Sequence, residues 1–526
     1  MREKLRNILK KIAGIGDDIQ FSLSEPPRPE YGDYATNLPL VLAKDRKENP
    51  MKLAAALKGK LLDDLIEKVE VAAPGFLNIT LTSKAKESAF HEILGSGENY
   101  GNQRTSSEKI QVEFISANPT GPLTLANGRG GFFGDVLSKV LETRGYEVER
   151  EYYINDAGNQ VRTLGLAILA STGLVPDSEE YYRGEHISEW AGEHKDECVT
   201  LKDDPEALGK KVAADFLRTM IQPAVEEKMK IKFDRWTSED TNLHKAGYVG
   251  RFLELAKSNG LVYENENAQW LKTTDFGDDK DRVLVTSDGF LTYLLADGGH
   301  YLETKERGFD RKILILGADH HGYIGRIQAV AQIVGLLKSE VVIMQLVRLM
   351  EGGVERRMSK RKGVYVTIDE LIDEVGLDAV RYFFLEKNPE THIDFDIALA
   401  KKHSKENPVY YVQYAHARIA SIFRKGAVMP DKFDFSLLSS DSEKTLISKL
   451  VRFPEILEDI AGDYRISRLV HYVYELANAF HVFYEKNRIL DAEDNIKEAR
   501  TSLAVATQIV LKRALWLLGM SAPEEM

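Results

Sequence analysis

A strand, a tight turn and a helix follow one another near residue 110, and this order constrains the fold more than any other feature of the chain. An apolar run at 110–115 precedes Asn118-Pro119-Thr120-Gly121-Pro122. Apolar side chains then recur at helical spacing, at Leu125, Phe132, Phe133, Val136, Leu137, Val140 and Leu141. A second strand is predicted at Glu147 to Ile154, which completes a right-handed parallel βαβ unit. The N–H groups and dipole at such a helix start favour an anionic ligand, although periodicity alone supports a unit without a ligand equally well.

Length and composition indicate a large multidomain protein. The chain has 526 residues, of which 43% are hydrophobic, enough to build several cores. No apolar run approaches the ~18 residues needed to span a bilayer, and the amphipathic start MREKLRNILKKIAGIGDD contains acids. We therefore expect a cytoplasmic protein with no membrane partner. The single cysteine, Cys198, excludes an intramolecular disulfide and any cysteine zinc site.

The charge distribution bears on nucleic-acid binding. A formal charge of −12 argues against an indiscriminate nucleic-acid binder, but not against one that recognises shape through local basic surface. The densest basic run is ERRMSKRK at 355–362. On its own, such a run is more often a solvated loop than a phosphate site.

The patterns divide the chain into three parts, and the predicted fold class is α/β multidomain. Residues 1–105 combine amphipathic helices with a strand signal near 69–81 and predict a small α+β domain. In residues 106–403, strand-like runs such as 312–316 and 341–346 alternate with helices, and a charge-rich helical stretch at about 165–235 predicts an insertion. Residues 404–526 are helical throughout and predict a bundle.

Five motifs in order resemble the class I arginyl-tRNA synthetases, whose catalytic domain is Rossmann-like. They are NPTGP at 118–122, YINDAGNQ at 153–160, GADHHGY at 317–323, MSKR at 358–361 and NPVYYVQYAHAR at 407–418. The similarity runs from about residue 28 to the C-terminus. Any one motif is weak evidence, but the ordered set is highly specific.

The resemblance implies a two-step reaction with three partners, which are L-arginine, tRNA(Arg) and ATP. Mg²⁺ would accompany ATP. The arginine carboxylate attacks the α-phosphate, and the arginyl group then passes to the terminal ribose of the tRNA. No protein nucleophile and no protein-bound metal are needed, since the site positions reactants and stabilises phosphate charge. The resemblance also implies a monomer that needs bound tRNA for its first step.

The two ATP signatures of the family fall at 124–127 and 357–361. The first normally reads His-Ile-Gly-His and here reads Thr124-Leu125-Ala126-Asn127. Thr124 and Asn127 still offer hydrogen-bond donors to phosphate, whereas the methyl group of Ala126 is expected to displace the adenine. In the second signature, Lys360 and Arg357 are expected to bind phosphate. The implied catalytic residues are Thr124, Asn127, Arg357 and Lys360, and the implied ATP-binding residues are Pro119, Gly121, Ala126, Asp319, His320, His321, Met358 and Ser359.

Adjacent Asp319, His320 and His321 also allow a metal site as a rival interpretation. We favour contact with the ATP ribose or the substrate, because no further cluster of ligands is evident in the sequence. Magnesium would arrive with ATP.

A guanidinium is best bound by a carboxylate, and the resemblance supplies four residues for arginine. Tyr293 and Asp297 have the i, i+4 spacing of one helix face, and with Glu113 and Asn118 they match the arginine ligands of the family. We assign Asp297 and Tyr293 to the guanidinium and Asn118 to the amino group. A core tyrosine with a surface acid is the alternative. The following Gly298-Gly299-His300-Tyr301 replaces the more usual Ile-Ala-Tyr-His, and two glycines are expected to weaken the helix by roughly 1 kcal/mol each.

The outer domains resemble modules that bind the tRNA elbow and the anticodon. Exposed aromatic side chains stack on unpaired bases, although aromatic residues at helical spacing are more often core. For Tyr410 and Tyr414 the two interpretations are equally supported. The implied tRNA-binding residues are Tyr31, Asn37, Tyr410, Tyr414, Arg418, Tyr484 and Met526.

Two other functions remain open from the sequence. The replaced residues at 124–127 are compatible with a non-catalytic or impaired tRNA-binding paralogue, which would bind tRNA without ATP–pyrophosphate exchange. A related nucleotidyltransferase that uses another small acid would be little affected by Asp297→Ala, whereas that change should abolish arginine binding if arginine is the substrate.

Overall fold

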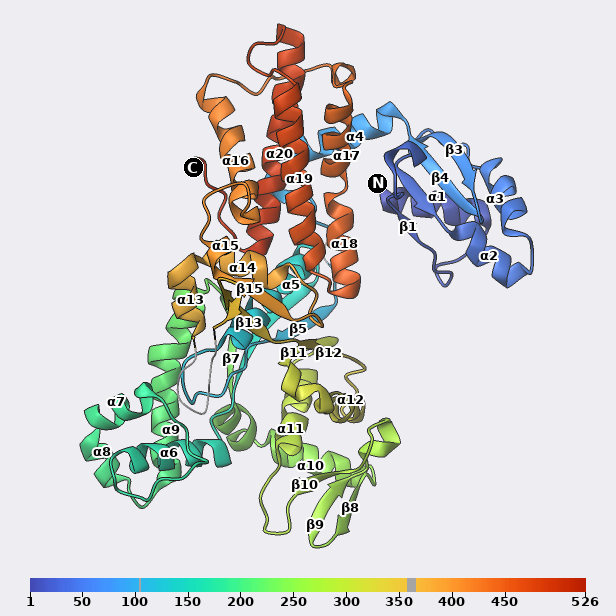
Figure 1. Ribbon diagram of the computed structural model, residues 1–526. Helices are drawn as coiled ribbons and strands as arrows, with labels where there is room; N and C mark the ends of the chain where they lie inside the picture. Colours follow the sequence, from blue (N-terminus) through green and yellow to red (C-terminus); the bar gives the residue numbers. More distant parts are fainter. Residues whose placement is uncertain (104–105, 357–365) are drawn as a thin grey trace.

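A five-stranded parallel sheet forms the centre of the molecule (Figure 1). Figure 1 shows a computed structural model, which describes residues 1–103, 106–356 and 366–526. The strand order is β12-β11-β5-β6-β7, with bounds β5 Lys109–Glu113, β6 Glu147–Ile154, β7 Arg235–Ser238, β11 Arg311–Gly317 and β12 Lys338–Met344. Helix α5 (Leu125–Thr143) joins β5 to β6, so the predicted βαβ unit is confirmed. Strand β5 has β6 on one side and β11 on the other, so the strand order reverses at β5. In parallel sheets of this kind, ligands bind at the carboxyl end of the strands at such a reversal.

The two faces of this sheet differ in chemistry because side chains alternate along a strand. Ile110 and Val112 of β5 belong to the same hydrophobic core as Phe132 and Val136 of α5. On the opposite face, Gln111, Glu113 and Glu151 with Lys312 of β11 are buried polar residues. Helix α11 (Tyr293–Glu306) covers this face, since its His300 and Thr304 bond Glu151 and Gln111.

A helical insertion lies between β6 and β7. It contains α6 Asn159–Ser171, α7 Glu185–Glu193, α8 Lys195–Thr200 and α9 Pro205–Phe216, followed by π-helical turns at Leu217–Ile221 and Ala224–Lys228. The insertion has its own hydrophobic core around Trp190. Helices α6 and α9 cross so closely at Gly165 and Gly209 that a Cβ atom on either residue would overlap backbone of the other helix.

A second module follows β7 and was not predicted from the sequence. It consists of α10 (Tyr248–Ser258) and an antiparallel sheet of order β10-β9-β8, with bounds β8 Val262–Asn265, β9 Ala268–Leu271 and β10 Arg282–Val285. Its apolar residues share a core with α11 and with α12 (Ile324–Ile333).

The described residues 347–356 and 366–400 lie between the central sheet and the C-terminal helices in the chain. They form a small sheet of order β14-β13-β15, with bounds β13 Val347–Glu351, β14 Val354–Glu355 and β15 Ile393–Asp396. The accompanying helices are α13 Ile368–Val375, α14 Leu377–Leu385 and α15 Ile397–Ala400. From α14, the buried Arg381 donates to the Asp135 carboxylate on α5 at 2.7 Å, to the Met229 carbonyl oxygen at 2.8 Å and to the Leu518 carbonyl oxygen at 3.2 Å.

The C-terminal helices form the predicted bundle. Their bounds are α16 Pro408–Arg424, α17 Asp441–Val451, α18 Phe453–Asp463, α19 Ser467–Lys486 and α20 Asp494–Leu518. By length and composition α20 is the one helix of the described residues that is apolar enough to cross a membrane, and 67% of its apolar stretch is buried within the protein.

The N-terminal residues fold into a small α+β unit that lies beside α18 (Figure 1). Helices α1 Arg2–Ala13, α2 Leu38–Arg46 and α3 Pro50–Lys58 pack with a sheet of order β1-β2-β4-β3, with bounds β1 Leu23–Ser24, β2 Tyr34–Thr36, β3 Ile66–Ala72 and β4 Phe76–Leu81. Its core ends at Ala85, at the start of α4 (Ser83–Ser96). Further along α4, Phe90 and Ile93 join the large core of the central domain and bundle.

Candidate functional site

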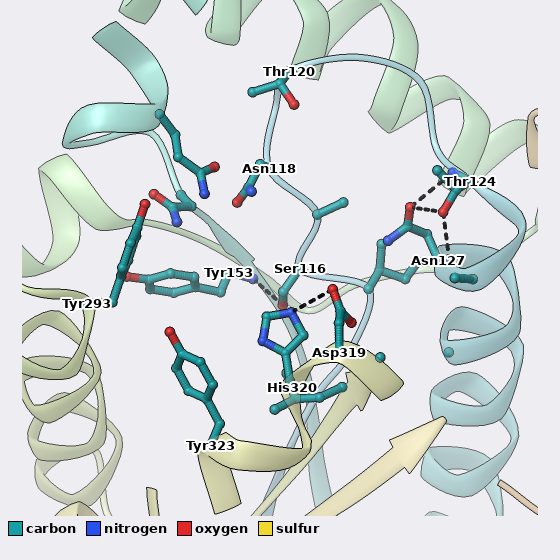
Figure 2. A pocket seen from close by; sticks show the side chains of 18 of the residues that line it. Ser116, Asn118, Thr120, Thr124, Asn127, Tyr153, Tyr293, Asp319, His320 and Tyr323 are labelled. Atoms are coloured by element: carbon teal, nitrogen blue, oxygen red, sulfur yellow. Dashed lines mark hydrogen bonds and ion pairs between the residues drawn. The ribbon is translucent and has the colours of Figure 1, made fainter. Parts of the chain in front are cut away.

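A cavity of about 1690 Å³ opens at the carboxyl ends of β5, β6 and β11. Its lining includes most of the loop 115–122, the start of α5 and the side of α11 that carries Tyr293, Asp297 and His300. Figure 2 shows Asn118 and Thr120 on this loop, with Asn127 on one side of the cavity and Tyr153, Tyr293 and Tyr323 on the other. Predicted residues that line it are Glu113, Asn118, Gly121, Thr124, Ala126, Asn127, Tyr293, Asp297, Asp319 and His320.

The chain leaves β5 in an unusual conformation. Ile115 and Ser116 both have positive φ, 64° and 39°, a region that β-branched residues rarely occupy. The Ser116 hydroxyl supports this bend, because it donates to Glu113 Oε1 at 3.2 Å and accepts from the Tyr153 N–H at 3.1 Å. Such strain is common where a backbone is shaped for a ligand.

Thr124 and Asn127 form a reciprocal cap at the start of α5. The Thr124 hydroxyl and N–H donate to Asn127 Oδ1 at 2.8 and 3.0 Å, and the Asn127 N–H donates to Thr124 Oγ1 at 3.4 Å. The hydroxyl proton of Thr124 therefore serves the cap, whereas the amide nitrogen of Asn127 lies toward the cavity (Figure 2). Of the two residues predicted to donate to phosphate, only Asn127 therefore directs a side-chain donor into the cavity.

The other predicted ATP residues near this turn occupy different surroundings. Ala126 is exposed and its methyl group lines the cavity, as does Gly121. Pro119 is buried and does not line the cavity. The segment after the basic run is held beside the turn, because the Ile368 N–H donates to the Leu123 carbonyl oxygen at 3.1 Å. The predicted residues Arg357, Met358, Ser359 and Lys360 lie outside the described residues.

The GADHHGY motif forms a 3₁₀ turn, Ala318–Tyr323, at the end of β11. Asp319 and His320 line the cavity, with a carboxylate-to-imidazole separation of 3.7 Å (Figure 2). The His321 side chain is outside the described part of the structure.

The predicted arginine residues lie together in the cavity. Helix α11 presents Tyr293, 45% exposed, at the opening and Asp297 deeper inside. Burial and then the negative charges of Glu113 and Glu239 raise the pKa of Asp297 to about 7. A ligand cation would remove this penalty, since an opposite charge favours the ionised carboxyl.

Glu113 is engaged in the polar layer beneath α11. Its carboxylate lies 2.9 Å from the Lys312 ammonium, which also donates to Gln111 Oε1 at 2.6 Å and lies 3.4 Å from Glu151. His300 Nε2 lies 2.9 Å from Glu151 Oε2. Glu113, Glu151 and His300 have the ligand types of a metal site, but the Lys312 ammonium already provides the cation between the two carboxylates.

Several cavity residues were not predicted as ligands. Asn155 Oδ1 and Gln160 Oε1 are buried without a hydrogen-bond partner among the described residues. Glu239 lines the cavity, accepts from the Tyr153 hydroxyl at 2.8 Å and lies 3.3 Å from His244. YINDAGNQ had identified the region of Asn155 and Gln160, whereas Glu239 lies in an unremarked segment after β7.

The glycines after Asp297 do not interrupt the helix, although their low helix propensity is expected to weaken it. Helix α11 is continuous from Tyr293 to Glu306. A Cβ atom at Gly298 would overlap the Phe252 ring, and one at Gly299 would lie 2.9 Å from the Val249 nitrogen, both on α10. The glycines therefore allow α10 to pack closely, and this packing offsets their low helix propensity.

The predicted tRNA residues of the bundle form one row. Tyr410 and Tyr414 stack with ring centroids 5.9 Å apart and are half-buried, and the Arg418 guanidinium lies over the Tyr414 and Tyr484 rings at 4.6 and 4.8 Å. Met526 is half-exposed at the end of a tail held against α16 by His416, which donates to the Pro523 carbonyl oxygen. Tyr31 and Asn37 lie apart from this row in the N-terminal unit, where Asn37 Oδ1 accepts from the Ser22 N–H.

Comparisons with known proteins match this arrangement along the whole chain. Residues 1–81 match the arginyl tRNA synthetase N terminal domain, 89–403 the catalytic domain of class I tRNA synthetases (R), and 412–526 the DALR anticodon binding domain. The fold is similar to that of Mycobacterium tuberculosis methionyl-tRNA synthetase, with a TM-score of 0.56, 13% identity and coverage of 78% of this chain and 91% of that one. It is thus the fold of a class I aminoacyl-tRNA synthetase, as predicted.

More similar proteins narrow the class to one family. The arginine–tRNA ligases of Carboxydothermus hydrogenoformans and Bacillus subtilis are each 42% identical, covering 97% and 100% of this chain and 95% and 99% of theirs. The solved Thermus thermophilus arginyl-tRNA synthetase superposes with a TM-score of 0.83 at 23% identity, with 100% of both chains covered. The chain belongs to the arginyl-tRNA synthetase family.

Proposed function

We propose that the protein is an arginine–tRNA ligase, which activates L-arginine with ATP and transfers it to tRNA(Arg) for protein biosynthesis. The observation that carries this proposal is one cavity that joins a pocket of carboxylates, from Asp297, Glu239 and Glu113, to the helix start at Thr124. A guanidinium suits the first part, and a nucleotide phosphate suits the second.

In the first step, a carboxylate oxygen of arginine bonds to the α-phosphorus of ATP, and the bond to pyrophosphate breaks. Asp297 and Tyr293 would hold the guanidinium, Asn118 the amino group, and Asn127 Nδ2 a phosphate oxygen. Arg357 and Lys360 would stabilise the departing pyrophosphate, with Mg²⁺ accompanying ATP. In the second step, a ribose hydroxyl of the tRNA attacks the arginyl carbonyl, and AMP leaves.

We further propose that the protein acts as a monomer in the cytoplasm. Tyr31 and Asn37 would contact the tRNA elbow, while Tyr410, Tyr414, Arg418, Tyr484 and Met526 would contact the anticodon loop. The row of stacked rings along α16 supports the second assignment. The alternative of a non-catalytic tRNA-binding paralogue gains no support from the site, because Asn127 still offers a donor.

Charging of total tRNA with labelled arginine tests the proposal. Arginyl-tRNA should form, and ATP–pyrophosphate exchange should require both arginine and tRNA. Asp297→Asn should abolish both reactions, whereas Asp288→Asn, in the exposed turn before α11, should preserve them. Binding of tRNA with no charging under any condition would instead favour the non-catalytic paralogue.

A further inference from the structure

The helical insertion supplies one wall of the reaction cavity. Tyr181, Tyr182, Arg183 and His186 line it together with Thr120 and Gly121 of the turn after β5. The insertion otherwise has a separate hydrophobic core, to which α7 contributes Ile187 and Trp190. Helix α7 is therefore anchored in the insertion while its first turn reaches the catalytic site.

His186 makes the contact between α7 and the turn. Its Nε2 atom lies 3.1 Å from the Thr120 carbonyl oxygen, and its ring packs edge-on against Phe216 with centroids 5.3 Å apart. Burial lowers the pKa of His186, which favours the neutral imidazole. Because the carbonyl can only accept, Nε2 carries the proton and donates it.

Two glycines make room for this imidazole. A Cβ atom on Gly121 would lie 2.7 Å from His186 Nε2, and one on Gly184 would lie 2.5 Å from His186 Cε1. Gly121 does not have the positive φ that requires glycine. The absence of a side chain at Gly121, the fourth residue of NPTGP, is thus explained by the neighbouring histidine.

The hydrogen bond from His186 to the Thr120 carbonyl oxygen also fixes the direction of the Gly121 N–H. A peptide group is planar and trans, so holding the Thr120 carbonyl toward His186 directs the Gly121 N–H the opposite way. Within the described ranges, no protein group accepts from this N–H. It is therefore available to a ligand oxygen beside the start of α5, where an anion is favoured.

We propose that His186 is a positioning residue for ATP, which holds the Thr120-Gly121 peptide so that the Gly121 N–H bonds an oxygen of the nucleotide. This rests on the proposed function, and it makes the insertion part of the ATP site.

Kinetics of ATP–pyrophosphate exchange in the presence of tRNA test the role of His186. His186→Ala should raise the KM for ATP about tenfold and change the KM for arginine less than twofold. His186→Gln, whose amide can donate from nearly the same place, should recover most of the loss. The control is His194→Ala in the same insertion, where the ring stacks on Trp190 and Nδ1 bonds the Trp190 carbonyl oxygen. It should leave the KM for ATP unchanged.

A change of less than twofold in the KM for ATP of His186→Ala, or an equal rise for arginine, would overturn the inference. Calorimetric titration of ATP into the same variants gives the same test without turnover. It separates failure of this inference from failure of the proposed function, since a wild-type protein without exchange would still show whether His186 affects ATP affinity.

A double-mutant cycle tests the explanation of Gly121. Gly121→Ala should weaken ATP binding as His186→Ala does, and the double variant should lose no more than either single variant, because the smaller side chain at 186 accommodates the methyl group. Additive losses would overturn this explanation.

Discussion

The Lys312 ammonium lies 2.9 Å from the Glu113 carboxylate, and both side chains are buried on the sheet face beneath α11. Register places Glu113 directly opposite Glu151 on the neighbouring strand, so Lys312 separates two like charges. Lys312→Met should therefore destabilise the protein by about 3–5 kcal/mol, the usual penalty for an unpaired buried charge. Urea unfolding measures the loss. The double variant Lys312→Met, Glu113→Gln should be more stable than Lys312→Met alone, because it lacks the unpaired carboxylate. If Lys312→Met lowers the free energy of unfolding by less than about 1 kcal/mol, the pairing of Lys312 with Glu113 is contradicted.

Asp297 should make arginine binding depend on pH. Burial and then Glu113 raise its pKa to about 7, while His300 and Lys312 act in the opposite direction and Glu239 in the same one. Protonation below pH 7 removes the charge that a guanidinium needs, so the Kd for arginine should rise about tenfold from pH 8 to pH 6. Calorimetric titration of arginine across this range, without ATP so that no turnover occurs, checks the expectation.

The raised pKa of Asp297 also affects the stability of the free protein. Arginine binding needs the ionised carboxyl, whereas folding of the free protein favours the protonated one. A carboxyl whose pKa is raised on folding stabilises the free protein below its unfolded pKa, and this contribution is lost as pH rises through about 7. Asp297→Asn should therefore bind arginine poorly yet unfold at a higher temperature than the wild type at pH 8. Equal melting temperatures at pH 8 would show that the carboxyl is not destabilised by its site.

The altered signature at 124–127 should lower ATP affinity without abolishing activity. Ala126→Gly removes the methyl group that lines the cavity and should lower the KM for ATP by about two- to fivefold. Leu125→Ile, with a buried side chain at the neighbouring position, is the matched control and should leave the KM for ATP nearly unchanged. A higher KM for Ala126→Gly would show that the methyl group contributes to ATP binding.

Asn155 and Gln160 should serve as acceptors for substrate N–H groups, because their buried oxygens have no partner among the described residues. Loss of one such acceptor leaves a substrate donor unpaired, so Asn155→Ala or Gln160→Ala should raise the KM for arginine about tenfold. Asn159→Ala changes an exposed amide in the same motif and is the control. If all three variants behave alike, the motif has a structural role.

Glu455 on α18 should control tRNA affinity through domain orientation. Its Oε1 accepts from the Arg2 N–H at 2.9 Å and from the Tyr34 hydroxyl at 2.5 Å, and Arg2 also pairs with Asp459. Glu455→Ala should raise the KM for tRNA several-fold while the KM values for ATP and arginine stay constant. Glu475→Gln removes an exposed acid of the same bundle and should have little effect.

Local periodicity predicted those elements that are long and buried on one side. The βαβ unit was recognised because α5 repeats apolar residues over five turns, and β6 has the predicted bounds. The module at 248–285 was missed because its strands have four residues each, too few for alternation to be evident.

The chemistry of the site was predicted less completely, because it depends on residues distant in sequence. The motifs placed Asn118, Asp297 and Asn127 in one cavity. They could not indicate that Thr124 and Asn127 cap each other, since the usual capping box has Glu or Gln at the fourth position. Nor could they relate Gly121 to His186, which lies 65 positions later and is brought near by the insertion.

Arg381 joins the catalytic domain to the C-terminal bundle. One guanidinium binds Asp135 on α5, the helix that begins beside Thr124, and the last carbonyl of α20 in the bundle. A tilt of the bundle relative to α5 would have to break one of these bonds. A buried, bonded side chain, and not only the covalent chain, therefore sets how the bundle sits on the helix that begins at the ATP turn.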